Sequence, residues 1–338
     1  MIREAIHELV AGHDLDREQA RGSMDDIMRG EATESQVAGF LIALRMKGES
    51  VDEMVGMVES MRAHATMISA PADAVDTCGT GGDGAGTFNI STAAALVMRG
   101  AGAVVAKHGN RASSSVCGSA DVLEALGVAV TLPPAAAEEC LNRAGIAFLF
   151  APNFHPAMRY AAVPRRELGV RTVFNFLGPL ANPAGVRRQS VGVGSAEATE
   201  KMAHVLAALG HVRALVFHGA DGLDELTTTG QSDVFDVNGG DVSRFRLDPA
   251  ELGLAMATAQ DLRGGDARRN AEIVRSVLDG TAGAPRDVVL LNAAAGLLAA
   301  GRVPAMGEGL VAARDSIDSG AARAALDDLA RTSTALAA

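Results

Sequence analysis

The 338-residue chain has no tryptophan, one tyrosine and only 3% aromatic residues, although hydrophobic residues make up 48% of it. A globular core packed from small and aliphatic side chains is therefore expected. No apolar run reaches the roughly 18 residues that a membrane-spanning helix needs. The sequence predicts no association with a membrane.

Cysteine is also scarce. Cys78, Cys117 and Cys140 are odd in number and lack the spacing of a metal site, which favours small buried thiols in the reducing cytoplasm. The first ten residues include His7 and Glu8, so they do not have the composition of a secretion signal. We expect a cytoplasmic protein.

Positive charge is the third deficit. Lysine and arginine number 30 against 41 acidic residues, giving a formal net charge of −11. This balance argues against general nucleic-acid binding, which requires a basic surface. An acidic protein that binds a polyphosphate must gather positive charge locally or recruit a metal ion.

Residues 1–66 are predicted to form helices only. Residues 33–36 and 50–53 each fit a capping box, the side-chain pattern that begins a helix. Met54, Met57 and Met61 have the spacing of one helix face. This stripe predicts packing in a core or in a helical subunit interface, and a binding surface is the alternative.

Beyond Pro71, short apolar runs alternate with helical patterns, which predicts an α/β domain with a mostly parallel central sheet. The expected strands are 103–106, 128–130, 147–150, 190–193, 214–218 and 233–237, and the expected helices are 120–126, 134–144, 196–210, 267–278, 287–300 and 317–330. A polar, turn-rich stretch near 164–183 interrupts this alternation and is expected to return to the helical part, leaving a cleft between domains. We therefore expect a small helical domain of 1–66 plus about 166–185, and a large α/β domain of 67–165 plus 186–338.

The most informative segment runs from Asp76 to Thr92. A short apolar strand at 74–75 leads into a loop with glycines at 79, 81, 82, 84 and 86, followed by a helix that Ser91 and Thr92 are expected to open. Glycine lets the backbone approach a ligand and turn its N–H groups inward. The start of the helix adds unpaired N–H groups and a positive dipole end. The segment predicts a phosphate cradle.

Two alternatives apply to this loop. Gly79, Gly81 and Gly84 fit the G-x-G-x-x-G dinucleotide motif, but the next strand ends in Lys107 and His108 where that motif requires an acidic residue. A purely structural turn is disfavoured because five glycines reduce stability. Asp83 would repel phosphate, so it is better suited to a ribose hydroxyl or a metal-bound water.

A second segment, 107–119, begins at a strand end with Lys107 and continues through Arg111 and three serines. Its cations and small donors predict a second phosphate site; a solvated basic loop is the alternative.

A third segment places Asp224 and Glu225 after an apolar strand. Adjacent carboxylates in a turn can hold Mg²⁺ together with substrate phosphates, whereas an exposed charged turn is the alternative.

A fourth segment contains His155 and, just beyond, Arg165. A guanidinium is suited to binding a carboxylate through two hydrogen bonds. His155 either donates to a substrate or is an ordinary loop histidine.

Together these segments resemble the anthranilate phosphoribosyltransferase family over essentially the whole chain. The resemblance rests on Gly79-Thr80-Gly81-Gly82-Asp83, Phe88-Asn89-Ile90-Ser91-Thr92, Lys107-His108-Gly109-Asn110-Arg111, Asn175-Phe176-Leu177-Gly178-Pro179-Leu180-Ala181-Asn182-Pro183 and Asp224-Glu225-Leu226. It implies the fold shared with pyrimidine nucleoside phosphorylases and a homodimer formed through the helical domains. It also implies the Mg²⁺-dependent reaction of anthranilate with phosphoribosyl pyrophosphate, which gives phosphoribosyl anthranilate and pyrophosphate.

The resemblance also implies residue roles. Phosphoribosyl pyrophosphate would be bound by Gly79, Gly82, Asp83, Thr87, Asn89, Ile90, Ser91, Thr92, Lys107, His108, Gly109, Asn110, Arg111, Ala112, Ser113, Ser114, Ser115 and Ser119. Anthranilate would contact Gly79, Asn110 and Arg165, with His108 and His155 along its path. The metal would be held by Ser91, Asp224 and Glu225, and no residue would be modified covalently. The chain departs from the family at Val163-Pro164, where Pro-Val is usual before the arginine.

Two rival functions were weighed. A nucleoside phosphorylase of the same fold usually has Lys-His-Ser where this chain has glycine at position 109. A relative that binds nucleic acid lacks the catalytic motifs, and both the net charge and the intact Asp224-Glu225 pair oppose it.

Overall fold

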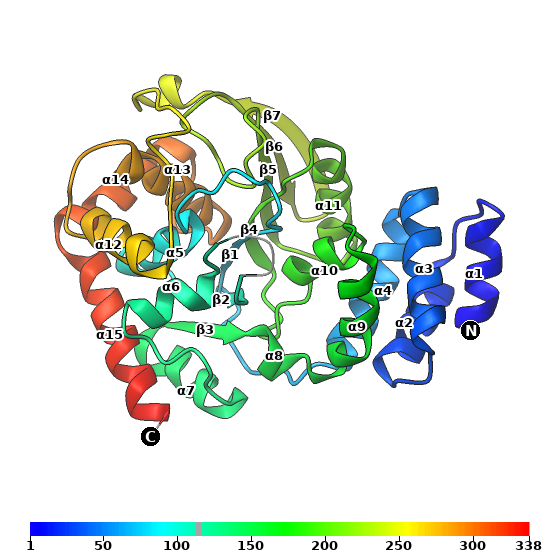
Figure 1. Cartoon of the computed structure of the whole chain (residues 1–338). Helices are drawn as coiled ribbons and strands as arrows, with labels where there is room; N and C mark the ends of the chain where they lie inside the picture. The colour runs from blue at the N-terminus through cyan, green and yellow to red at the C-terminus, as the bar shows by residue number, and fades with distance from the viewer. Residues whose placement is uncertain (113–115, 338) are drawn as a thin grey trace.

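The structure is a computed structural model and describes residues 1–112 and 116–337. It consists of a small helical part that carries the N-terminus and a larger α/β part that carries the C-terminus (Figure 1). No helix among the described residues is long and apolar enough to cross a membrane.

The small part begins with four helices: α1 (Ile2–Val10), α2 (Arg17–Met28), α3 (Glu34–Lys47) and α4 (Val51–Ala63). Both expected capping boxes are confirmed, with Thr33 bonded to Gln36 at the start of α3 and Ser50 to Glu53 at the start of α4. The structure adds a third at Asp16, which begins α2.

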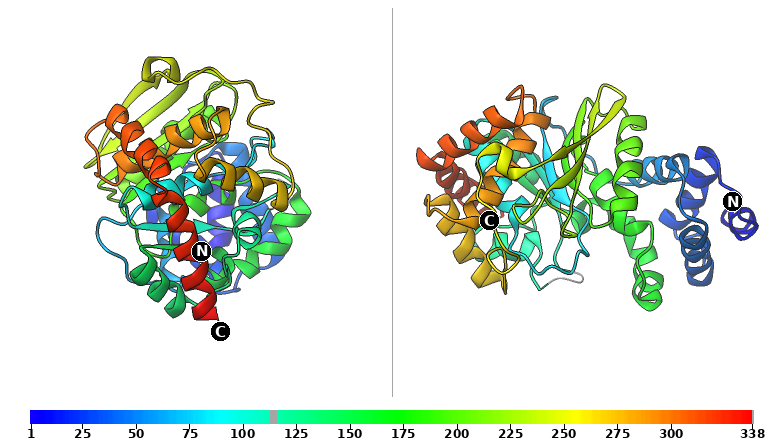
Figure 2. Two further views of the ribbon diagram at one scale, coloured as in Figure 1. Left: turned by 90° about the vertical axis from the view of Figure 1, so that its left-hand side faces the viewer. Right: turned by 90° about the horizontal axis from the view of Figure 1, so that it is seen from above.

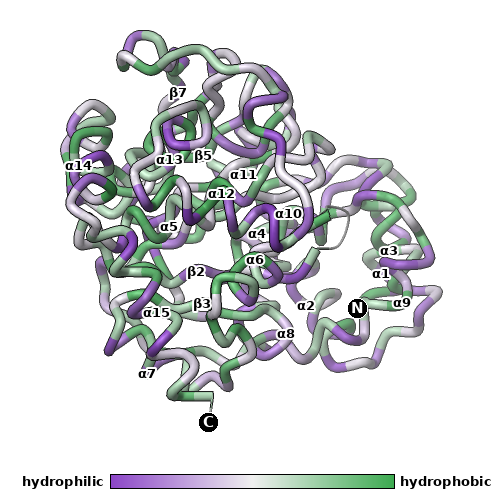
Figure 3. Tube along the Cα trace, turned by 60° about the vertical axis from the view of Figure 1, so that its left-hand side comes forward, coloured by the Kyte–Doolittle hydropathy of each residue, from purple (hydrophilic) through white to green (hydrophobic). Residues whose placement is uncertain are grey.

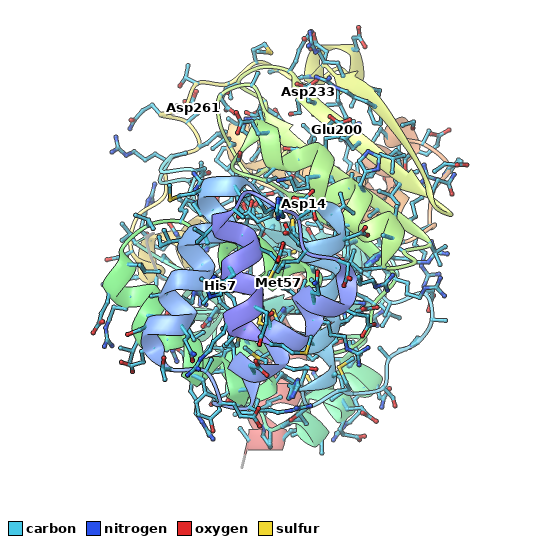
Figure 4. All side chains as sticks on the ribbon, turned by 90° about the vertical axis from the view of Figure 1, so that its right-hand side faces the viewer. His7, Asp14, Met57, Glu200, Asp233 and Asp261 are labelled. Carbon is cyan, nitrogen blue, oxygen red and sulfur yellow. The ribbon has the colours of Figure 1, made fainter. Side chains whose placement is uncertain are left out.

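The methionine stripe of α4 lies in the core of this helical bundle. Met54, Met57 and Met61 are 2%, 0% and 5% exposed. Packing in a core is therefore confirmed, and the alternative of a binding surface is wrong. Figure 4 looks onto the bundle and labels Met57 inside it.

Two later helices join the bundle, α9 (Arg159–Leu168) and α10 (Phe174–Leu180). Helix α9 contacts α2 and α3, and α10 contacts α4. Arg62 of α4 donates from Nε and Nη2 to the Leu180 carbonyl, at 3.0 and 2.6 Å. Helices α9 and α10 therefore pack against the helical part.

The central sheet has the order β3-β2-β1-β4-β5-β6-β7, with a bridge between Val75 and Val105 linking β2 to β1. Its first five strands are parallel and the last two antiparallel, so the sheet is mostly parallel as expected. The strands are β1 (Asp76–Gly79), β2 (Val105–Gly109), β3 (Ile146–Phe150), β4 (Arg188–Gly192), β5 (Arg213–Gly219), β6 (Ser232–Asn238) and β7 (Asp241–Leu247).

Helices cover both faces of the sheet. Helix α11 contacts β5 and β6 on one side and α4 of the bundle on the other, whereas α5 contacts β1 and β2 and packs against α13 and α15 (Figures 1 and 2). The helices are α5 (Ile90–Gly100), α6 (Ser119–Ala125), α7 (Pro134–Ala144), α8 (Ala151–Phe154), α11 (Ala196–Ala208), α12 (Ala267–Leu278), α13 (Ala284–Ala299), α14 (Met306–Asp318) and α15 (Ala321–Ala337), with 3₁₀ turns at Pro156–Met158 and Pro249–Leu252. Hydrophilic and hydrophobic stretches alternate along the outer helices (Figure 3), as in helices that bury one face.

Three expectations about single elements were wrong. Residues 128–130 form no strand; the run is buried, and Ala129 N donates to Ser333 Oγ of α15 at 3.0 Å. The helix expected at 317–330 is divided between α14 and α15 at Gly320, whose φ of 78° suits glycine. Strand β7 was not expected, although the Gly239-Gly240 turn before it, with φ of 59° and 104°, is typical of a hairpin.

Candidate active site

The carboxyl ends of three parallel strands, β2, β1 and β5, lie at the same edge of the sheet, with β4 between β1 and β5. The glycine loop follows β1, Lys107 lies in β2, and the turn bearing Asp224 and Glu225 follows β5. In open α/β sheets, ligands bind at the carboxyl ends of the strands. The fold thus brings three of the four predicted segments to the position where a ligand is expected.

The glycine loop needs glycine for two separate reasons. Gly81, Gly82, Gly84 and Gly86 all have positive φ, between 66° and 77°, which other residues rarely adopt. At Gly79 the conformation is ordinary, but an added Cβ would lie 2.1 Å from Asp224 Oδ2. The loop is therefore shaped partly by the acidic turn that packs against it.

The acidic turn is tied directly to the phosphate cradle. Gly81 N donates to Asp224 Oδ2 at 2.6 Å, and Ser91 N donates to Glu225 Oε1 at 3.0 Å. Burial raises the pKa of both carboxyl groups, with the charge of Asp83 adding to the effect at Asp224 and that of Asp224 at Glu225. Two adjacent acids whose pKa values are both raised, by burial and by a neighbouring carboxylate, form a site that favours a cation.

Lys107 is the cation already present beneath this site. Its side chain is only 4% exposed, and Nζ donates to the Thr77 carbonyl at 2.6 Å and to Ser91 Oγ at 3.4 Å. Its charge acts to lower the pKa of Glu225 against the effect of burial. Lys107, Ser91 and Glu225 thus meet at the start of α5.

The start of α5 differs from the prediction. The helix begins at Ile90 with Asn89 as N-cap, and Asn89 makes no side-chain capping bond. Its amide instead donates to the Cys117 carbonyl at 3.2 Å and accepts from Asn270 Nδ2 at 2.9 Å. Ile90 and Thr92 are each only 1% exposed, so neither presents its side chain at the surface of the loop.

The loop after β2 is closed on itself. Asp121 Oδ2 accepts from Ala112 N at 3.0 Å and from Gly118 N at 2.8 Å, and Ser119 Oγ donates to the Asn110 carbonyl at 3.2 Å. A Cβ at Gly109 would lie 2.3 Å from Ser119 Oγ, so glycine there is required by packing. Ser113, Ser114 and Ser115 lie outside the described residues.

Arg111 does not supply free positive charge in this structure. Its guanidinium bonds to Glu124 at 2.6 and 2.7 Å and to Asp121 at 3.1 Å. It also lies 5.6 Å from the centre of the Phe150 ring. Arg111 must leave these acids before it can bind a phosphate, because both carboxylates compete for the same donors.

The two histidines named in the sequence lie side by side. His108, in β2, and His155, after α8, have ring centres 5.3 Å apart. Burial lowers the pKa of both, that of His108 to about 3. The Nε2 atom of each is buried with no hydrogen-bond partner among the described residues. Both rings are thus neutral at neutral pH, and the Nε2 atom of each is available for a hydrogen bond to a ligand.

Arg165 is the fourth predicted feature. It lies in α9, and its guanidinium is 5.0 Å from the centre of the Phe174 ring. No carboxylate pairs with it in the described part of the chain. The preceding Pro164 is accommodated inside α9, so the shifted proline does not remove Arg165 from the helix. A half-buried, unpaired guanidinium is suited to an anionic ligand.

Sequence reasoning missed three residues that shape the site. Arg171 donates to the carbonyls of Gly81 and Gly82. Asn292, in α13, pairs with the backbone of Leu226 next to Glu225. Arg263 forms a backbone bridge with Thr87 of the glycine loop. The only sequence signal available was Asn292, the single polar side chain between Val288 and Ala299 of α13.

Comparison with known proteins identifies the family. Residues 3–65 match the helical bundle domain of a glycosyl transferase family, and residues 71–323 match its α/β domain. The anthranilate phosphoribosyltransferase of Moorella thermoacetica is 55% identical over 327 residues, 96% of each chain. The crystal structure of the Thermus thermophilus enzyme has a TM-score of 0.93 at 43% identity, covering 98% of this chain and 99% of that one.

A more distant structure shows ligands. The Saccharomyces cerevisiae anthranilate phosphoribosyltransferase in complex with phosphoribosyl pyrophosphate (PRPP) and Mg has a TM-score of 0.91 at 27% identity, covering 99% of this chain and 98% of that one. The same yeast enzyme has been solved with 4-fluoroanthranilate. The chain described here therefore belongs to the anthranilate phosphoribosyltransferase family, and it is a phosphoribosyltransferase of tryptophan biosynthesis.

Proposed function

We propose that the glycine loop, the start of α5 and the acidic turn bind PRPP, and that Arg165 with the two histidines binds anthranilate. The observation that carries this proposal is the acidic pair. Glu225 is buried and Asp224 is half-buried, and they accept hydrogen bonds from the N–H groups of Ser91 and Gly81. Their charge fits a cation-bound polyphosphate at the edge of the sheet.

The residues present fit Mg²⁺. Asp224 and Glu225 offer carboxylate oxygens, Ser91 Oγ lies beside them near Lys107, and the remaining positions are left for phosphate oxygens and water. No group of three or more His, Cys, Asp or Glu side chains with metal-binding geometry occurs among the described residues. The donor set is therefore suited to a metal that arrives with its substrate. When bound, Mg²⁺ would neutralise the charge of the pyrophosphate group.

The chain's own residues would position two substrates. The amine of anthranilate is already a nucleophile, so no strong base is needed. It would form a bond to the anomeric carbon of the ribose as the bond to pyrophosphate breaks. Lys107 would stabilise the departing negative charge, and Arg165 would fix the carboxylate of anthranilate. No covalent bond to the enzyme is part of this scheme.

The two histidines would act as neutral hydrogen-bonding groups. His108 and His155 keep an unpaired Nε2 each, and the low pKa of His108 keeps its ring uncharged at neutral pH. They would contact anthranilate without adding a charge that could compete with Arg165.

We also propose that the chain is a homodimer formed through its helical domain, which comprises residues 1–66 and about 166–185. The exposed apolar side chains Met1, Val10 and Met46 on the bundle support this. Cys78, Cys117 and Cys140 form no disulfide within the described residues, which supports a cytoplasmic location.

The direct test of the proposed reaction uses the fluorescence of anthranilate. Addition of PRPP and Mg²⁺ to the enzyme should abolish this fluorescence, and omission of PRPP or Mg²⁺ should leave it unchanged. Arg165→Ala should raise the KM for anthranilate far more than the KM for PRPP. An equal rise for both substrates would count against the role of Arg165. Activity that is independent of Mg²⁺ would count against the metal.

A further inference from the structure

The tip of the glycine loop is held from outside by one side chain. Arg171 lies between α9 and α10, and its Nη2 and Nη1 atoms donate to the carbonyls of Gly81 and Gly82 at 2.9 and 2.8 Å. The guanidinium lies 5.6 Å from the centre of the Phe176 ring. No carboxylate pairs with it among the residues that the structure describes.

The same tip is held from the other side by the acidic turn. Asp224 Oδ2 accepts from Gly81 N, while Arg171 donates to the two carbonyls that follow. The N–H of Gly81 and the carbonyls of Gly81 and Gly82 are thus all held by side chains from outside the loop. An added Cβ at Gly82 would lie 2.4 Å from Arg171 Nη1, so the side chain is packed directly against the loop.

The segment that carries Arg171 also carries Arg165. Each guanidinium stacks on a ring of α10, Arg165 on Phe174 and Arg171 on Phe176. The turn that follows Arg171 is fixed because Thr172 N donates to Asn175 Oδ1 at 2.9 Å. One short segment therefore presents a guanidinium to the proposed carboxylate subsite and a second one to the phosphate loop.

We propose that Arg171 is a positioning residue that couples the two substrate subsites. Binding of anthranilate at Arg165 restricts the position of the α9–α10 segment. Because Arg171 belongs to this segment and holds the carbonyls of the glycine loop, the position of the loop backbone that faces PRPP is restricted with it. The effect is reciprocal, because each ligand must change the affinity of the other by the same factor. The planar guanidinium is essential here, since an ammonium cannot hold two carbonyls in one plane. The proposal rests on the proposed role of Arg165.

The test is two-substrate steady-state kinetics on the full-length enzyme. The readout is the interaction factor, the ratio by which saturating anthranilate lowers the KM for PRPP. For coupled sites this factor is typically about 5 to 150. In Arg171→Gln we expect it to fall to about 1, with a raised KM for PRPP and a smaller change in kcat. Arg171→Lys should recover only part of the coupling. Arg166→Gln, an exposed position on α9, should keep the wild-type factor.

Three outcomes would overturn the proposal. An unchanged interaction factor in Arg171→Gln would show that the loop is set without Arg171. An equal loss in Arg166→Gln would show a general charge effect. If Arg165→Ala leaves the KM for anthranilate unchanged, the carboxylate subsite is wrong and the coupling proposal fails with it. If Arg165→Ala raises that KM while Arg171→Gln keeps the factor, only the coupling is wrong. Thermal unfolding of each variant separates these effects from a loss of folding.

Discussion

At the scale of single residues, the site contains ionisable side chains whose charged forms are disfavoured by loss of hydration. Glu225 is buried beside the half-buried Asp224, and Lys107 is enclosed below them. The family resemblance implied that these residues serve one site, and the sequence itself placed each of them at or after the end of a strand. It could not predict that Arg111 pairs with Glu124, since that contact depends on how α6 packs.

The raised pKa values make a prediction about pH. Burial raises the pKa of Glu225 from 4.5 to about 8 in the folded protein, so the folded state binds a proton that the unfolded state releases. For the metal-free protein, the stability contributed by this proton is present below pH 4.5 and is lost as the pH rises towards 8. Chemical denaturation between pH 5 and 8 should show this decline in wild type.

The matched comparison removes the titrating groups. In Asp224→Asn with Glu225→Gln, the decline in the free energy of unfolding between pH 5 and 8 should be smaller. Asp327→Asn with Asp328→Asn changes two adjacent exposed acids of α15 and should behave like wild type. Identical pH dependence in all three proteins would show that the acidic pair does not hold extra protons.

At the scale of elements, loops are shaped by neighbours that lie far away in the sequence. Most strands of the sheet were predicted from apolar runs, and α7 and α12 have the expected bounds, whereas α9 and α10 were expected only as a polar, turn-rich stretch. The segment 128–130 was mistaken for a strand because buried apolar residues look the same with or without a strand partner. Arg171 was missed because its partners are backbone carbonyls, and no sequence pattern records these.

Helix α13 provides a clear test of such a contact. Asn292 is 1% exposed, accepts from Leu226 N at 3.0 Å and donates to the Leu226 carbonyl at 2.8 Å. Asn292→Leu should leave both backbone groups unpaired, at about 1–3 kcal/mol each. Leu226, next to Glu225, would lose its hydrogen bonds to α13, and Glu225 would be held less firmly. The Mg²⁺ concentration needed for half-maximal activity should therefore rise.

Urea denaturation and a Mg²⁺ titration of activity measure the two effects of Asn292→Leu. Asn238→Leu, at the exposed end of β6, is the control for a change of asparagine to leucine. A variant that is destabilised but has an unchanged Mg²⁺ requirement would show that Asn292 supports the fold without positioning the acidic turn.

At the scale of the whole molecule, the site lies where three strands of the large part face the segment that connects it to the helical part. That segment includes Arg165 and Arg171, and α10 is bonded to α4 through Arg62. The return of this stretch to the bundle was predicted from its polar, turn-rich composition. The proposed pairing of two bundles could be inferred only from the family resemblance.

The proposed dimer leads to a prediction about mass. Sedimentation equilibrium should give twice the 34.6 kDa mass of one chain at micromolar concentrations. The distribution should not shift towards a monomer on dilution over the working range of the activity assay. A single species of one chain mass with full activity would contradict the homodimer.

The most direct test of the whole account is calorimetric titration of PRPP into the enzyme, with and without Mg²⁺. Wild type and Asp327→Asn with Asp328→Asn should bind more tightly when Mg²⁺ is present. Asp224→Asn with Glu225→Gln should lose that gain while still folding. The same gain from Mg²⁺ in all three proteins would contradict the assignment of the acidic pair, and with it the proposed centre of the site.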